Sequence, residues 1–104
     1  SGGENIASSE VERVLHQLPQ VLEAAVIGVP DERWGERIAA VVVLHPGTGL
    51  TLKALRAHCA GRLGGFKTPK QLELRDALPR NPSGKVLKRV LRDELANEVE
   101  KDQS

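Results

Sequence analysis

The longest apolar run in the sequence, Ile38 to Leu44 (IAAVVVL), constrains the fold more than any other feature. It has the length of a β-strand and is far too short to span a bilayer. Successive side chains of a strand point to opposite faces, so a run that is apolar at every position must be covered on both faces. Segment 37–45 is therefore predicted to be the central strand of a covered sheet.

The flanking segments predict a small set of further elements. Ser9 and Glu12 have the spacing of a capping box, which predicts a helix that starts at Ser9 and ends before Pro19. Thr51 is expected to cap a second helix. The predicted order is helix, strand, strand, helix, strand, helix, with helices over 9–18, over 52–63 and from 87, and strands over 21–29, 37–45 and 70–78. The predicted fold class is therefore α+β, a small mixed sheet of about three strands with helices packed on it.

Composition limits the partners and the location. The 104 residues suit one domain, and a net charge of +1 gives no strong field for nucleic acid or a membrane surface. The single cysteine, Cys59, excludes an intrachain disulfide and favours a cytoplasmic protein. We interpret residues 1–104 as one domain with a polar tail over 96–104. The abrupt start SGGEN is interpreted as the cut end of a longer chain.

Two glycine patterns resemble phosphate-binding loops without matching them. The Ser-Gly-Lys at 83–85 lacks the distant glycine and the following Ser or Thr of a Walker loop, because Pro79 and Val86 occupy those positions. Gly2-Gly3 has no third glycine at the spacing of a dinucleotide fingerprint, so on local grounds a turn is the preferred interpretation.

The histidines and the cysteine give no metal signal. His16, His45 and His58 are scattered without metal-ligand spacing, and they are interpreted as surface or boundary residues. Cys59 is predicted to be a small buried hydrophobe, since no second cysteine supports a metal or redox pair. We therefore predict no metal site in this chain.

The segment LPRNPSGKVLKR places a lysine on an unusually stiff turn. Pro79 and Pro82 fix φ and reduce the entropy lost when the turn is ordered, and Gly84 permits close approach of another surface. Such a turn can hold the Lys85 ammonium, a compact point charge, toward a partner or a ligand phosphate. An incidental lysine on a structural turn is the alternative that the local sequence leaves open.

Several stretches in this order resemble one family. GGENIASSEVERVL, EAAVIGVPDERWGE, AAVVVL, FKTPKQLEL and LPRNPSGKVLKRVLR are similar to the C-terminal small domain of the adenylate-forming acyl-CoA synthetases, which are AMP-binding enzymes. The resemblance covers residues 1–95.

The resemblance implies a mobile lid that works with a large N-terminal domain, which this chain lacks. In that family the large domain holds ATP, magnesium and the carboxylic acid. The lysine matching Lys85 bridges the carboxylate and the phosphate oxygens while acyl-adenylate forms. The lid then rotates, Lys85 leaves, and the face with Gly2-Gly3 lines the pantetheine tunnel for the CoA thiol. The chain alone is therefore expected to be folded but inactive, and to bind none of ATP, Mg²⁺ or CoA tightly.

The resemblance also assigns weaker roles to other residues. Gly2, Gly3, Glu4 and Asn5 match the substrate- and CoA-binding start of the domain, and Asn5 stands where relatives often carry an Arg or Gln that contacts the nucleotide. Lys67 matches a basic residue that meets CoA phosphate or the large domain. An ordinary solvated lysine is an equally favoured interpretation. Ser83 and Gly84 match the turn that shapes the lysine, and Trp34, Gly35 and Glu36 match a structural loop.

Three functions follow from the sequence, and the first is preferred. It is the lid of an ATP-dependent carboxylate–CoA ligase, acting on a fatty or an aryl acid. The second is the corresponding part of an adenylation domain that loads a carrier protein. The third is a non-catalytic interaction module whose Pro-rich turn docks a partner.

Overall fold

The computed structural model describes residues 6–33 and 35–103, with side chains over 8–33 and 35–97. Its strands β1 (Val21–Asp31), β2 (Gly35–Leu44) and β3 (Gln71–Leu74) form one sheet in the order β1-β2-β3. β1 and β2 are antiparallel, whereas β2 and β3 are parallel. The predicted α+β class, the mixed sheet and the central position of the apolar strand are confirmed.

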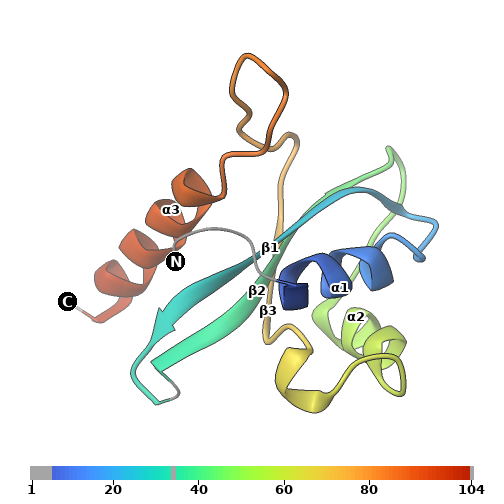
Figure 1. Ribbon diagram of the computed structural model, residues 1–104, viewed down its shortest axis with the longest axis horizontal. Coiled ribbons are helices and arrows are strands. Elements are labelled where there is room, and N and C mark those ends of the chain that lie inside the picture. Colours follow the sequence, from blue (N-terminus) through green and yellow to red (C-terminus); the bar gives the residue numbers. More distant parts are fainter. Residues whose placement is uncertain (1–5, 34, 104) are drawn as a thin grey trace.

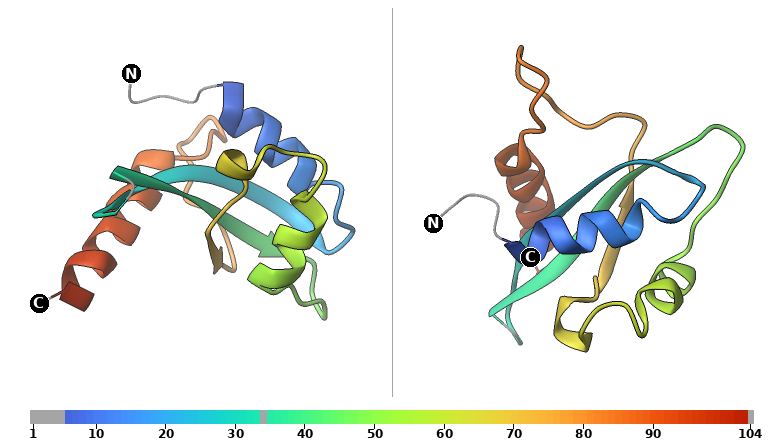
Figure 2. Two further views of the ribbon diagram at one scale, coloured as in Figure 1. Left: turned by 90° about the horizontal axis from the view of Figure 1, so that it is seen from below. Right: turned by 45° about the vertical axis from the view of Figure 1, so that its right-hand side comes forward.

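Helices cover both faces of this sheet. α1 (Ile6–Leu15) and α2 (Leu52–Cys59) lie on one face, and α3 (Lys88–Gln103) lies on the other (Figures 1 and 2). A short 3₁₀ helix, Gly65–Lys67, leads into β3. Thr51 caps α2 as predicted, because its side-chain oxygen accepts a hydrogen bond from the Ala54 N–H at 3.1 Å.

Two apolar clusters explain why β2 is apolar throughout. Ala40 and Val42 belong to the cluster under α1 and α2, with Leu15 and Leu55. The alternating residues Ala39, Val41 and Val43 of β2 belong to the cluster under α3. The other members of that cluster are Ala25, Ile27, Val29, Leu78, Leu91 and Leu95. The pleat thus sends consecutive side chains of one strand into two separate cores.

Several boundaries differ from the predicted ones. α1 begins at Ile6, so Ser9 lies inside the helix and the capping box predicted at Ser9 is wrong. α2 ends at Cys59, before the predicted boundary, and β3 is shorter than 70–78. α3 continues through the polar tail as far as Gln103.

Glu12 contacts β1 and α3 instead of forming the predicted cap. Its Oε2 accepts a hydrogen bond from the backbone N–H of Val26 at 2.8 Å and lies 2.7 Å from Lys88 Nζ. Val26 is on β1, and among the described residues no strand pairs with the outer edge of β1. The carboxylate therefore satisfies a donor on an open sheet edge and links α1 to the first residue of α3.

Cys59 is fully buried at the end of α2, as the sequence predicted. Burial raises the pKa of its thiol above the ordinary value of 9.0, and the guanidinium charges of Arg56 and Arg62 offset part of that rise. The native thiol is therefore protected from alkylating reagents by both access and protonation.

The raised pKa gives a prediction for alkaline pH. Above pH 9.0 the unfolded thiol loses its proton before the native thiol does, so the unfolded state binds fewer protons. The free energy of unfolding should then fall as pH rises, by up to about 1.4 kcal/mol per pH unit from this group. Urea unfolding between pH 8 and pH 11 measures the slope, and Cys59→Ala should remove this increment. Equal slopes for the two proteins would contradict the account.

Candidate functional site

The segment between β3 and α3 carries Lys85 on a projecting turn. Both ends of the turn are fixed in the body of the domain, because Leu78 is buried and Val86 packs against the cluster under α3. Between these anchors the chain leaves the sheet and returns (Figures 1 and 2). Arg80 and Val86 pair as an antiparallel bridge, and the Leu87 N–H donates to the Pro79 carbonyl at 2.8 Å. The turn is thus a short closed hairpin on an anchored stem.

Asn81 organises the tip of this hairpin. Its Oδ1 accepts three hydrogen bonds, from the Ser83 N–H at 3.1 Å, the Ser83 Oγ at 2.7 Å and the Lys85 N–H at 2.9 Å. The Asn81 N–H in turn donates to the Lys85 carbonyl at 3.0 Å. Both backbone polar groups of Lys85 are therefore bonded to one residue.

Sequence reasoning missed Asn81 and attributed the stiffness of the turn to its prolines. The available signal was the Asn-Pro-Ser stretch, because an asparagine carboxamide in a turn readily accepts hydrogen bonds from backbone groups that follow it.

Gly84 and Arg80 complete the turn. Gly84 has a φ of +91°, in the region that favours glycine, and its N–H donates to the Asn81 carbonyl at 2.9 Å. Arg80 Nη1 donates to the Gly84 carbonyl at 2.6 Å, and Arg80 Nη2 forms an ion pair with Glu23 of β1. The guanidinium therefore ties the tip of the hairpin back to the sheet.

The Lys85 side chain itself is exposed at the end of this scaffold. Two other basic side chains of this segment are paired within the domain, since Arg80 pairs with Glu23 and Lys88 with Glu12. Among the side chains that the structure describes, none pairs with the Lys85 ammonium, which is thus left available to a group from outside the domain.

Lys67 lies in a different environment. Its Nζ is 2.8 Å from Glu10 Oε1 of α1 and 5.6 Å from the ring centroid of Phe66, which is 81% exposed. This charge is already compensated by a carboxylate, in contrast to the Lys85 ammonium. The two lysines belong to different regions of the chain and do not form one cluster.

The remaining predicted residues fall into two groups. Gly2, Gly3, Glu4, Asn5 and Trp34 lie outside the described residues. Gly35 and Glu36 open β2. The Glu36 carboxylate lies over Gly28 of β1, where a Cβ would collide with it. This cross-strand packing is consistent with a structural role for Glu36, as the sequence predicts for its loop.

The titratable groups do not gather into a metal site. Across the described ranges, no three or more His, Cys, Asp or Glu residues are placed to hold a metal ion. His58 Nε2 lies 2.8 Å from the Val14 carbonyl and links α2 to α1, while His16 and His45 are exposed. Nor is any described helix long and apolar enough to cross a bilayer.

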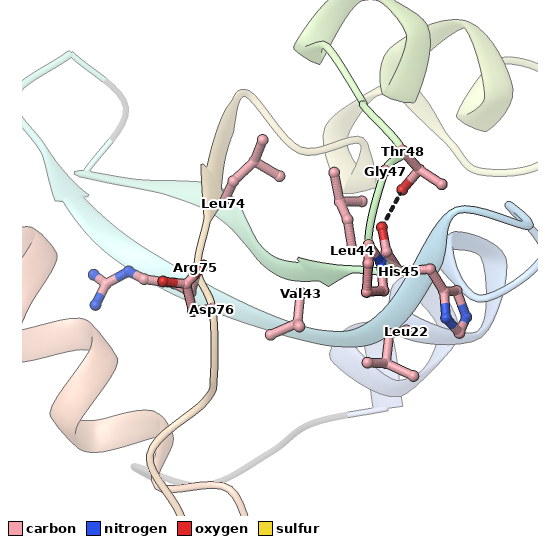
Figure 3. Close-up of a pocket in the computed structure, with 10 residues that line it drawn as sticks. Leu22, Val43, Leu44, His45, Gly47, Thr48, Leu74, Arg75 and Asp76 are labelled. Atoms are coloured by element: carbon pink, nitrogen blue, oxygen red, sulfur yellow. Dashed lines mark hydrogen bonds between the residues drawn. The ribbon is translucent and has the colours of Figure 1, made fainter.

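A hollow of about 510 Å³ opens at the end of the sheet where β1 begins and β2 and β3 end, and none of the described site residues lines it (Figure 3). Its apolar part is formed by Leu22, Val43 and Leu74, and Leu22 and Leu74 are each about half exposed. Its polar rim includes Arg75, which pairs with Glu94 of α3 at 2.9 Å. It brings together none of the groups that the sequence proposes for chemistry.

Comparison with known proteins identifies the domain. Residues 10–85 match the family described as the AMP-binding enzyme C-terminal domain. The chain belongs to this family. The match begins within α1 and runs through the sheet and α2 to Lys85.

Relatives of this AMP-binding C-terminal domain share both sequence and fold. A long-chain-fatty-acid–CoA ligase of Mycobacterium tuberculosis is 45% identical over 101 residues, which are 97% of this chain and 20% of the relative. A fatty acid–acyl-carrier-protein ligase of Streptomyces coeruleorubidus is 48% identical over 91 residues, which are 88% of this chain and 18% of the relative. The solved fatty acyl-CoA synthetase of Mycobacterium tuberculosis superposes with a TM-score of 0.81 and 44% identity, over 94% of this chain and 19% of that one. The chain thus spans about a fifth of the length of these proteins.

A glycine substitution tests the geometry of the Lys85 turn in this C-terminal domain. Gly84→Ala should cost about 1–2 kcal/mol of stability, because a Cβ is disfavoured at a φ of +91°. Gly49→Ala is the matched control, since Gly49 has ordinary φ and open space around it, and it should be neutral or stabilise by up to about 1 kcal/mol. Urea unfolding of both variants measures the difference. Equal effects would show that the turn does not depend on this conformation.

Proposed function

We propose that this chain is the C-terminal lid domain of a cytoplasmic ATP-dependent carboxylate–CoA ligase. The observation that carries the proposal is the Lys85 turn. It holds an exposed ammonium, which pairs with none of the described side chains, on a hydrogen-bonded hairpin with an anchored stem. A cation held away from its own domain in this way is suited to enter a cleft on another domain. That other domain is the large N-terminal adenylation domain, which supplies the sites for ATP and the acid.

In the first half-reaction, a carboxylate oxygen of the acid attacks the α-phosphorus of ATP. The bond between the α-phosphorus and the oxygen that bridges the α- and β-phosphates breaks, and acyl-adenylate and pyrophosphate form. Negative charge is distributed over the carboxylate and phosphate oxygens in the transition state. The Lys85 ammonium stabilises this charge, and a fixed cation needs no reorganisation when the charge develops.

In the second half-reaction, the lid rotates and Lys85 withdraws. The CoA sulfur, after losing its proton, attacks the acyl carbonyl carbon, and the bond to the AMP oxygen breaks. The face with Gly2 and Gly3 is proposed to line the path of the thiol in this pose, because the absence of glycine side chains leaves room for pantetheine. Glu4 and Asn5 are proposed to bind substrate or CoA, with Asn5 at the position that contacts the nucleotide in relatives. Lys67 is proposed to meet a CoA phosphate there, in competition with its present partner Glu10. One domain thus serves two steps in two orientations.

Magnesium accompanies ATP in this scheme, but the described part of this chain does not fit it. No cluster of carboxylates or imidazoles with ligand geometry is present among residues 8–33 and 35–97. The proposal therefore places the metal with the large domain and routes no step through it.

A carrier protein is the second candidate acceptor of the acyl group. It is favoured by the relative named as an acyl-carrier-protein ligase, which is 48% identical to this chain. In that case the thiol belongs to the phosphopantetheine of a carrier, while the role of Lys85 in adenylation is the same. Thioester formation with CoA and with a phosphopantetheinylated carrier, compared at equal thiol concentration, distinguishes the two acceptors.

The proposal is tested by Lys85→Ala in the ligase that contains this domain, with the two half-reactions assayed separately. Acid-dependent pyrophosphate release should fall about 10²–10³-fold, the usual cost of removing one transition-state electrostatic contact. Thioester formation from preformed acyl-adenylate and CoA should be retained. Lys53→Ala, on the exposed face of α2, is the matched control and should leave both steps unchanged.

Retention of both steps in Lys85→Ala would overturn the catalytic role and leave the turn as a structural or partner-docking feature. Loss of a binding partner without loss of acid activation would favour the interaction module instead.

A further inference from the structure

We propose that Asn81 is the positioning residue for Lys85 in the adenylation step. The inference rests on the proposed function, because it assumes that the Lys85 ammonium acts in the first half-reaction. It adds a residue that the sequence analysis did not assign, and it names the atom that acts, the carboxamide Oδ1.

The bonding pattern singles out Asn81 from the other residues of the turn. The Lys85 N–H donates to Asn81 Oδ1 at 2.9 Å, and the Lys85 carbonyl accepts from the Asn81 N–H at 3.0 Å. These two bonds hold the peptide groups on either side of the Lys85 Cα. They therefore set both the position of that Cα and the direction in which its side chain leaves the backbone.

The same oxygen also holds the rest of the tip. Oδ1 accepts from the N–H and the hydroxyl of Ser83, so three donors converge on one acceptor. Loss of Oδ1 frees all three at once, whereas loss of the Ser83 hydroxyl leaves both backbone donors in place. The amide NH₂ of asparagine cannot replace the oxygen, because it has no acceptor capacity.

The other contacts of the turn act at a distance from Lys85. Arg80 and Glu23 tie the Gly84 carbonyl to β1, and Leu78 and Val86 anchor the stem. These contacts orient the hairpin as a body, while Asn81 determines how Lys85 is presented at its tip. A long, flexible lysine side chain amplifies any error in its starting direction, and a displacement of about 1 Å can cost about 100-fold in rate.

The test uses Asn81→Leu in the ligase that contains this domain, since leucine is similar in size and has no acceptor. The kcat of acid-dependent pyrophosphate release should fall between about 10- and 100-fold, with the KM values for ATP and acid changed by less than about 3-fold. Thioester formation from preformed acyl-adenylate should be unchanged. Asn97→Leu, at an exposed position of α3, is the matched control and should retain wild-type rates in both steps.

Two further variants separate positioning from a merely structural effect. Asn81→Asp keeps an acceptor oxygen at the same place and should recover most of the kcat lost in Asn81→Leu. In a Lys85→Ala background, Asn81→Leu should cause no further loss, because a residue that acts through Lys85 has nothing left to position. Thermal midpoints of all variants are measured alongside.

The outcomes distinguish this inference from the function on which it rests. If Lys85→Ala retains adenylation, the proposed function fails. If Lys85→Ala loses adenylation but Asn81→Leu does not, only the role of Asn81 fails. Equal loss of both half-reactions in Asn81→Leu, or an additive loss in the Lys85→Ala background, would also overturn positioning and leave Asn81 with a structural role.

Discussion

Burial of β2 on both faces is the constraint on which the rest of the structure depends. Its alternate side chains enter two separate aliphatic cores, one under α1 and α2 and one under α3. A helix layer on one face of the sheet cannot cover both cores, so the chain must place helices on both sides of the sheet. The segment from β3 to α3 is consequently anchored in the core at Leu78 and Val86, and the stretch between these anchors forms the projecting turn.

Two kinds of interaction then act on Lys85 at different scales. Apolar burial fixes the stem of the hairpin, because Leu78 and Val86 pack with the whole cluster under α3. Hydrogen bonds to Asn81 fix the tip, and each is individually weak. A rigid-body motion of the domain can therefore move Lys85 into or out of a distant site without changing how the turn presents it. This separation suits the proposed role of the domain as a lid that serves two steps.

Much of this could be predicted from the sequence, because the signals were periodic or local. The apolar run of β2 and the Thr51 cap gave the sheet order and the start of α2 correctly. The start of α1 could not be read from Ser9 and Glu12, because Glu12 is used in a tertiary contact with β1 and α3 instead. The pairing of Arg80 with Glu23 joins residues far apart in the chain, and no local pattern encodes it. Asn81 was overlooked for the opposite reason, since its signal was local but was masked by the more conspicuous prolines.

In the proposed function, an ammonium held at the position of Lys85 is what the first half-reaction needs from this domain. The most direct measurement is chemical rescue of Lys85→Cys in the ligase that contains it, with wild-type enzyme treated in parallel. Cys59 is fully buried and its thiol pKa is raised, so it is protected from alkylation in the native domain. Aminoethylation rebuilds a lysine-like ammonium at residue 85 and should restore acid-dependent pyrophosphate release, whereas carbamidomethylation adds a neutral amide and should not. Equal activity after the two treatments would contradict the account, as would full activity of unmodified Lys85→Cys.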